Sequence, residues 1–119
     1  MSITRVRISV KGQPLTAELG DNATAKALRT MLPLSLPMLD LYDQELVHRF
    51  EDSLPADDLE ERAPQRGEIV YWAPRNALAI FYADSGEAFA ELQPVGLVVS
   101  GIDSLDHPGD VTVSWELID

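Results

Sequence analysis

Hydrophobic and polar residues alternate through the first part of the chain. In residues 5–11, Val6, Ile8 and Val10 occupy every second position and polar or charged side chains fill the others. The same alternation resumes at Leu15 after a turn around Gly12. A period of two is typical of a strand with one buried face, because successive side chains point to opposite sides. These two segments therefore predict a β-hairpin.

The period changes after Gly20. Mostly apolar residues then recur at three- and four-residue spacing, which places them on one face of a helix. These residues are Thr24, Ala27, Leu28, Met31 and Leu32. Asp21 or Asn22 can cap this helix by accepting a backbone N–H bond. Pro33 cannot continue it, because proline lacks the N–H donor and clashes with the preceding turn. One short helix is predicted near residues 23–32.

Short apolar segments occupy most of the rest of the chain. Residues 34–41 alternate again, and Pro37 within them suits an edge or a bulge because it removes one ladder donor. Residues 77–82 are apolar on both faces, as expected of a strand covered on both sides. Further strands are predicted at 68–72, 95–99 and 110–117. Seven or eight short strands with one helix indicate an all-β domain, and closure into a barrel would remove its exposed edges.

The segment from residue 42 to residue 67 is polar and acidic. It contains a short apolar island at Leu46, Val47 and Phe50, and two prolines. We expect most of it to be a long surface loop, and loops of that length in a small domain are often functional.

Composition narrows the functional classes. The 119 residues are 45% hydrophobic and 24% charged, which is ordinary for one globular domain spanning residues 1–119. Nine Lys and Arg against twenty Asp and Glu give a formal net charge of −11, which argues against binding to nucleic acid or to an anionic membrane surface. No signal-peptide pattern or spanning apolar run is present, so we expect a cytoplasmic protein with no membrane association.

Residues 67–82 follow a distinctive order. A glycine and an acidic residue precede an apolar pair, an aromatic pair precedes an x-Pro turn, and an Ala-Leu segment ends on two aromatic residues: Gly67-Glu68-Ile69-Val70-Tyr71-Trp72-Ala73-Pro74-Arg75-Asn76-Ala77-Leu78-Ala79-Ile80-Phe81-Tyr82. Together with the opening hairpin, the helix, the acidic segment and the Val95-Gly96 strand, this order resembles a prokaryotic family of small cyclophilin-like proteins. The resemblance spans nearly the whole chain. It implies a closed cyclophilin-like β-barrel of about eight mostly antiparallel strands, and it implies a fold rather than an activity.

Residues 47–50 contain a His-Arg pair that is similar to the Phe-His-Arg stretch of true prolyl isomerases. The resemblance implies that the arginine of this pair stabilises the twisted peptide bond of a substrate, whose rotation barrier is ~18–20 kcal/mol. His48 and Arg49 are therefore candidate catalytic residues. The chain departs from the isomerase pattern, because Val47 precedes the histidine and the Gln-Gly-Gly-Asp segment and the Asn- and Phe-rich strand are missing. In the alternative interpretation, both residues lie on an exposed strand and pair with Glu45, Glu51 or Asp52.

Aromatic residues supply the candidate binding groups. Alternation places Tyr71 and Trp72 on opposite faces, so at least one of them points away from the barrel interior or lies beneath a loop. An aromatic ring with a polar tip at a groove can anchor a ligand. We name Phe50, Tyr71 and Tyr82 as candidate ligand-binding residues, with packing in the core as the alternative for each.

No metal or cofactor is predicted. The acidic residues 57–61 lack the alternating spacing and central glycine of a calcium loop. His48 and His107 are far apart in sequence and have no carboxylate at ligand spacing. The chain has no cysteine, no Gly-x-Ser-x-Gly elbow and no glycine-rich phosphate cradle.

Two functions from different classes follow. The first is a non-catalytic module that binds a small molecule or an extended peptide in a groove under residues 42–67. The second is a weak or divergent prolyl isomerase that uses Arg49, with His48 and either Phe50 or Tyr82 framing the proline. We favour binding without catalysis, because most of the isomerase motif is missing. The net charge favours a neutral or cationic ligand, and either a monomer or a homodimer is compatible with the sequence.

Overall fold

Strands dominate residues 3–57 and 59–118, the parts of the chain that the computed structural model describes. In chain order the elements are β1 (Thr4–Val10), β2 (Gln13–Leu19), α1 (Ala23–Met31), β3 (Leu34–Leu41), β4 (Glu45–Arg49), β5 (Glu60–Arg62), β6 (Glu68–Trp72), β7 (Ala77–Phe81), β8 (Phe89–Ser100) and β9 (Val111–Leu117), with single 3₁₀ turns at Ala73–Arg75 and Ile102–Ser104. The strand order is β2-β1-β9-β3-β4-β7-β6-β8-β5, and β2 also pairs with β8.

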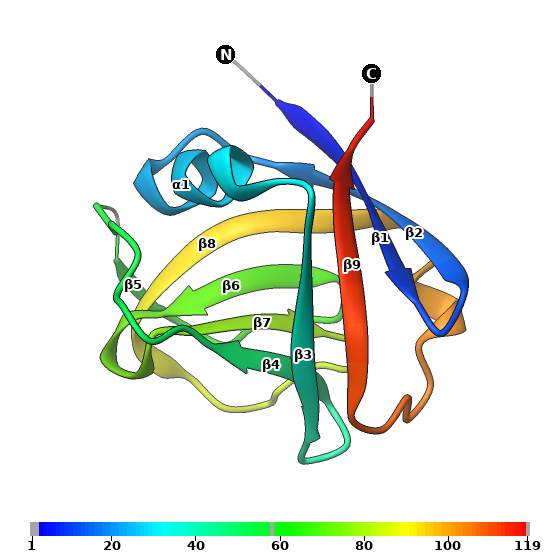
Figure 1. Ribbon diagram of the computed structural model, residues 1–119. Coiled ribbons are helices and arrows are strands. Elements are labelled where there is room, and N and C mark those ends of the chain that lie inside the picture. The colour runs from blue at the N-terminus through cyan, green and yellow to red at the C-terminus, as the bar shows by residue number, and fades with distance from the viewer. Residues whose placement is uncertain (1–2, 58, 119) are drawn as a thin grey trace.

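The pairing of β2 with β8 closes eight strands into a barrel, to which β5 adds one further strand (Figure 1). All strand pairs described are antiparallel. The predicted fold class is therefore confirmed: an all-β, closed barrel of antiparallel strands with one short helix.

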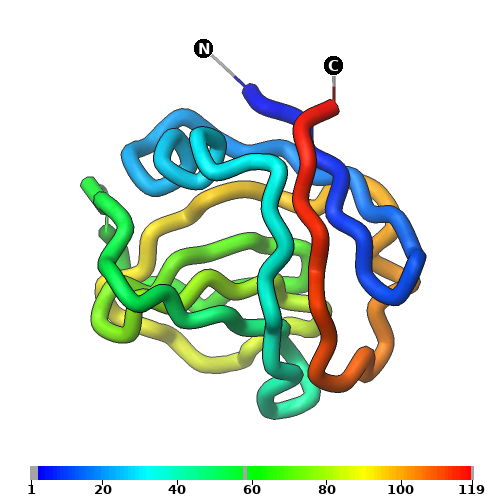
Figure 2. The backbone as a smooth tube through the Cα atoms, in the orientation of Figure 1, coloured from blue at the N-terminus to red at the C-terminus, as the bar shows by residue number. Residues whose placement is uncertain are grey.

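The barrel interior is filled by every second side chain of its strands. The largest side chains that are almost fully buried include Trp115, Tyr71, Phe81, Ile8 and Leu15, and all of these except Phe81 belong to the interior core. The helix α1 covers one end of the barrel and buries Leu28 against that core (Figures 1 and 2). Asn22 caps the helix as predicted, since its side-chain oxygen accepts a bond of 3.0 Å from the backbone N–H of Ala25.

The described residues of the 42–67 segment are mostly irregular, as predicted, but the first part of the segment contains a strand that the prediction did not include. Residues 45–49 form β4, which lies between β3 and β7 in the sheet. Its outward positions carry Glu45 and Arg49, so the charged residues at both ends concealed a strand whose middle residues are buried. Residues 60–62 add the short strand β5.

Residues 50–57 of that segment lie against the barrel rather than extending into solvent. Phe50, Leu54 and Ala56 pack against the interior core. The backbone N–H of Leu54 donates to the Tyr71 hydroxyl at 2.8 Å, and the N–H of Asp57 donates to the Gln93 side chain at 2.9 Å. This segment therefore helps to close the end of the barrel on which α1 lies.

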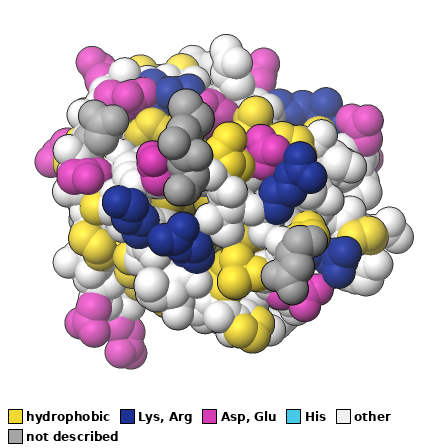
Figure 3. Space-filling model, turned by 90° about the horizontal axis from the view of Figure 1, so that it is seen from above, with side chains coloured by type: hydrophobic (Ala, Val, Ile, Leu, Met, Phe, Trp, Pro, Cys, Tyr) yellow, Lys and Arg dark blue, Asp and Glu magenta, His cyan; other side chains and the backbone are white. Residues whose placement is uncertain are grey.

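The face that carries α1 and both chain ends mixes basic and acidic side chains, and its hydrophobic areas are small and divided (Figure 3). Within the described residues, no helix is long and apolar enough to cross a membrane.

The seam between β2 and β8 requires a residue without a side chain. A Cβ atom at Gly96 would lie 2.4 Å from the carbonyl oxygen of Glu18 and 3.2 Å from Cα of Leu19. We therefore expect Gly96→Ala to force the two strands apart and to lower the free energy of unfolding by about 1–3 kcal/mol, measured by urea denaturation.

Gly20→Ala is the matched control for this seam. A Cβ atom at Gly20 would have its nearest neighbour, the carbonyl oxygen of Val95, at 3.7 Å, an ordinary contact. Its midpoint should stay close to that of the unsubstituted protein. Equal stability of the Gly96→Ala and Gly20→Ala proteins would show that close approach at the seam is not required.

Candidate functional site

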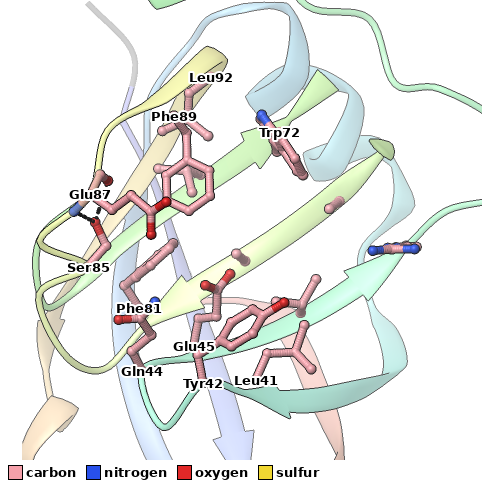
Figure 4. A pocket seen from close by; sticks show the side chains of 15 residues that line it. Leu41, Tyr42, Gln44, Glu45, Trp72, Phe81, Ser85, Glu87, Phe89 and Leu92 are labelled. Atoms are coloured by element: carbon pink, nitrogen blue, oxygen red, sulfur yellow. Dashed lines mark hydrogen bonds between the residues drawn. The ribbon is translucent and has the colours of Figure 1, made fainter. Parts of the chain in front are cut away.

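A groove lies on the outer face of the barrel, across β4, β7, β6 and the first part of β8. It has a volume of about 390 Å³, which is in the range of small-molecule sites. Its lining includes a second apolar cluster, separate from the interior core, formed by Val47, Val70, Ala77, Ala79, Phe81 and Leu92. The groove is therefore built on side chains that point away from the barrel interior (Figure 4).

Strand pairing arranges the groove in rows. Ala77 pairs with Arg49 on one side and Trp72 on the other. In the next row, Ala79 pairs with Val47 and with Val70. Because alanine side chains end at Cβ, β7 leaves a depression between the larger side chains of β4 and β6. Neighbouring strands lie ~4.8 Å apart, so the backbones that carry Arg49 and Trp72, one on each side of Ala77, are about 10 Å apart.

Aromatic rings form one wall of the groove. Phe89 makes edge-to-face contacts with Trp72, at a centroid distance of 5.7 Å, and with Phe81, at 6.5 Å. The indole N–H of Trp72 donates to the carbonyl oxygen of Ala90 at 2.9 Å, which fixes the orientation of the ring. Tyr42, which is 80% exposed, stands at the opposite rim. The wall therefore presents oriented π surfaces to the groove.

Glu45 is the buried charge of the groove. Only 8% of the residue is exposed, and its carboxyl group points into the groove (Figure 4). It makes no ion pair with any residue in the described part of the chain. Burial raises the pKa of Glu45 from its ordinary value of 4.5 to about 7, against a smaller lowering by the hydrogen bond with Gln44. At neutral pH this carboxyl group is therefore divided between its charged and its neutral form.

Arg49 lies at the other end of the same strand. It is exposed and lines the groove, and four residues of strand place its Cα about 13 Å from that of Glu45. Over the described residues, its guanidinium group has neither an ion pair nor a side-chain hydrogen bond. The pairing with Glu45, Glu51 or Asp52 that the alternative interpretation proposed is absent.

The other candidate residues lie outside the lining of this groove. His48 alternates to the opposite face of β4, where its Nδ1 bonds the carbonyl oxygen of Pro37 at 2.9 Å and its ring contacts Phe50 at 4.7 Å. Tyr71 is fully buried in the interior core. Tyr82 is 6% exposed and donates its hydroxyl to Asp40; burial, followed by this bond, raises the pKa of Tyr82 above its usual range.

Tyr82 also borders a second, more polar hollow of about 280 Å³ beside His107. There the His107 ring lies 3.4 Å from a carboxylate oxygen of Asp43, and Arg66 pairs with Asp103. Across the residues described, no group of three or more His, Asp or Glu is arranged to hold a metal ion.

Sequence reasoning therefore found one lining residue, Arg49, and missed the rest of the groove as a site. Two signals were present. Residues 77–82 are apolar on both faces, and Tyr71 and Trp72 alternate. The structure confirms both patterns, with Trp72 on the outer side of the barrel. Neither pattern could show that Glu45 and Phe89 line the same groove as Trp72.

Comparison with known proteins identifies the family. Residues 8–116 match the model of the cyclophilin-like family. The chain belongs to this family. The barrel of this cyclophilin-like protein is also similar to the solution structure of a hypothetical protein from Archaeoglobus fulgidus, with 17% sequence identity and a TM-score of 0.69 over 98% of this chain and 95% of that one. At this identity the likeness shows the fold alone. No curated protein matches the chain.

The buried Glu45 makes stability depend on pH. Because its pKa is higher in the folded than in the unfolded chain, the folded state binds more protons between pH 4.5 and about 7. Below pH 4.5 the carboxyl group is neutral in both states, so its burial costs no charge penalty. The free energy of unfolding then decreases as the pH rises through about 7 and the buried group becomes charged. Glu45→Gln removes this loss, so the variant should gain on the unsubstituted protein by up to about 3 kcal/mol between pH 4 and pH 8.

Urea denaturation at pH 4, 6 and 8 measures this difference. Glu87→Gln is the matched control, because Glu87 lines the same groove and is exposed. A stability difference for Glu45→Gln that stays constant over this range would contradict the buried, unpaired state of Glu45.

Proposed function

We propose that this cyclophilin-like protein is a binding module that holds a small molecule or an extended peptide in the outer groove. The observation that carries the proposal is the arrangement of Glu45 and Arg49. Two charged side chains face one apolar, aromatic-walled groove from opposite ends, and neither has an ionic partner among the described residues.

The cost of burying Glu45 supports this proposal. A carboxyl group taken out of water destabilises the fold unless it is paired or protonated. The floor of the groove also carries the small side chains of Ala77 and Ala79, which leave space between the larger residues of β4 and β6. A ligand with an apolar body and polar ends would cover this floor and supply the missing partners.

The groove differs in place from the one expected beneath residues 42–67. Residues of the first part of that segment line it, and the 50–57 segment does not. Phe50, Tyr71 and Tyr82 lie outside the lining of this groove. A role for them in ligand binding is therefore a separate proposal that the groove does not support.

Filling the groove should abolish binding. Ala79 lies in the middle of the floor, so Ala79→Leu would occupy the depression while keeping an apolar residue on β7. Ligand-observed NMR with small ring compounds that carry an amine or amide should detect binding to the unsubstituted protein and its loss in Ala79→Leu. Ala63→Leu, at an exposed position outside the groove, is the control and should bind normally. Binding that survives Ala79→Leu places the site elsewhere.

Prolyl isomerisation is the second candidate function. The supporting observation is that Arg49 borders an aromatic-walled groove without a carboxylate partner in the described chain, which leaves its guanidinium free to donate to a peptide bond. His48 and Phe50 lie on the other side of β4, so Trp72 or Phe89 would have to frame the proline ring instead.

Exchange NMR on a tetrapeptide, Ala-Ala-Pro-Phe, separates the two functions. A binding module leaves the cis–trans exchange rate of the peptide at its uncatalysed value, which corresponds to tens to hundreds of seconds. An isomerase accelerates it, and Arg49→Ala removes the acceleration while the fold is retained. We expect no acceleration, and a rate enhancement that Arg49→Ala abolishes would overturn the assignment as a non-catalytic module.

A further inference from the structure

We propose that the Glu45 end of the groove is a subsite for the cationic group of a small organic amine, whose apolar ring lies over the alanine floor of β7. This inference rests on the proposed binding function and specifies the ligand class of the same groove.

The first step is the unmatched carboxyl group. Glu45 is more than nine-tenths buried and points into the groove, where a ligand atom can reach it. Nothing in the described chain supplies a positive charge to it, and its hydrogen bond with Gln44 does not neutralise it. A protonated amine would supply both the charge and the hydrogen-bond donors that a buried carboxylate lacks.

The second step is the aromatic surroundings of this end. Phe81 pairs with Glu45 across β4 and β7, and Phe89 packs edge-to-face on Phe81. Tyr42 lines the same groove and is exposed at its rim (Figure 4). Aromatic faces attract cations through their π electrons. The faces of such rings repel an anion.

The third step is a second carboxylate. Glu87 lines the same groove from the loop before β8. Ser85 holds the backbone of Glu87 in place, because its hydroxyl donates to the Glu87 carbonyl at 2.8 Å and accepts from the Glu87 N–H at 3.1 Å (Figure 4). The formal net charge of −11 adds an overall field that attracts cations.

Arg49 determines the orientation of the ligand in the groove. It is the basic residue among those that line the groove, and it lies about 13 Å along β4 from Glu45. The amine therefore belongs at the Glu45 end, and a carbonyl or other acceptor of the ligand belongs toward Arg49. The volume of about 390 Å³ suits a small molecule rather than a folded partner.

Three compounds with one ring system test the charge preference: tryptamine, indole-3-propionamide and indole-3-propionate. Titration of the ¹⁵N-labelled protein at pH 8 should show tryptamine binding at least about ten-fold more tightly than the propionate. Glu45→Gln should weaken tryptamine about ten-fold or more and leave the neutral amide unchanged. Glu87→Gln, at the exposed rim, should weaken tryptamine only two- to three-fold.

The pH dependence gives an independent readout. Because the carboxyl group of Glu45 has a pKa of about 7 and must be ionised to hold the amine, tryptamine should bind about 30-fold more tightly at pH 8 than at pH 5.5. Glu45→Gln should remove this dependence. The other titratable groups that line the groove are Tyr42, Arg49 and Glu87, while β6 and β7 contribute none to the lining.

The outcomes separate the two proposals. If the amide and tryptamine bind equally, with both lost in Ala79→Leu, the cation subsite is wrong and the groove function stands. If none of the three compounds binds at millimolar concentration, the amine subsite is wrong, and the groove function is decided by the Ala79→Leu test. Tighter binding of a lysine-containing peptide than of tryptamine, through Glu45, would overturn the assignment to a small-molecule ligand.

Discussion

Strand β7 is apolar on both faces, and the closed barrel can accept only one of them. Leu78 and Ile80 fill the interior, where Tyr71 and Trp115 also pack. Ala77, Ala79 and Phe81 must then face outward. Apolar residues on the outside of a barrel remain exposed unless something covers them, and here side chains from β4, β6 and β8 rise around them and leave a groove. The site is thus a direct consequence of closing this particular set of strands.

Charge placement turns this groove from a packing feature into a candidate binding site. Glu45 and Arg49 share one face of β4 with Val47 between them. A strand is rigid and extended, so the two charges cannot approach each other along it. The backbone therefore keeps the two charges from neutralising each other, and the free-energy cost of burying the Glu45 carboxylate is not offset within the described chain.

Much of the barrel could be predicted from local patterns. The hairpin at 4–19, the helix at 23–31 and the two-faced strand at 77–81 each follow from a period of apolar residues that is complete within a few positions. The resemblance carried by residues 67–82 extended these patterns to a closed barrel, which the pairing of β2 with β8 confirms. Strand β4 was not predicted from the pattern of apolar residues, because a five-residue strand with a charge at each end has too short an apolar run to reveal its period.

The sequence by itself determined which side chains share a face of each predicted strand, where the helix begins, and that one strand would be covered on both sides. Only the tertiary structure decided that Glu45 and Arg49 meet Trp72, Phe81 and Phe89 around one groove. The order β4-β7-β6-β8 joins strands that are separated by up to about forty residues of chain, and the acidic segment between β4 and β6 contains no periodic signal of which strands it connects. Alternation is a local property of the backbone, whereas the choice of neighbouring strands depends on how the whole core is packed.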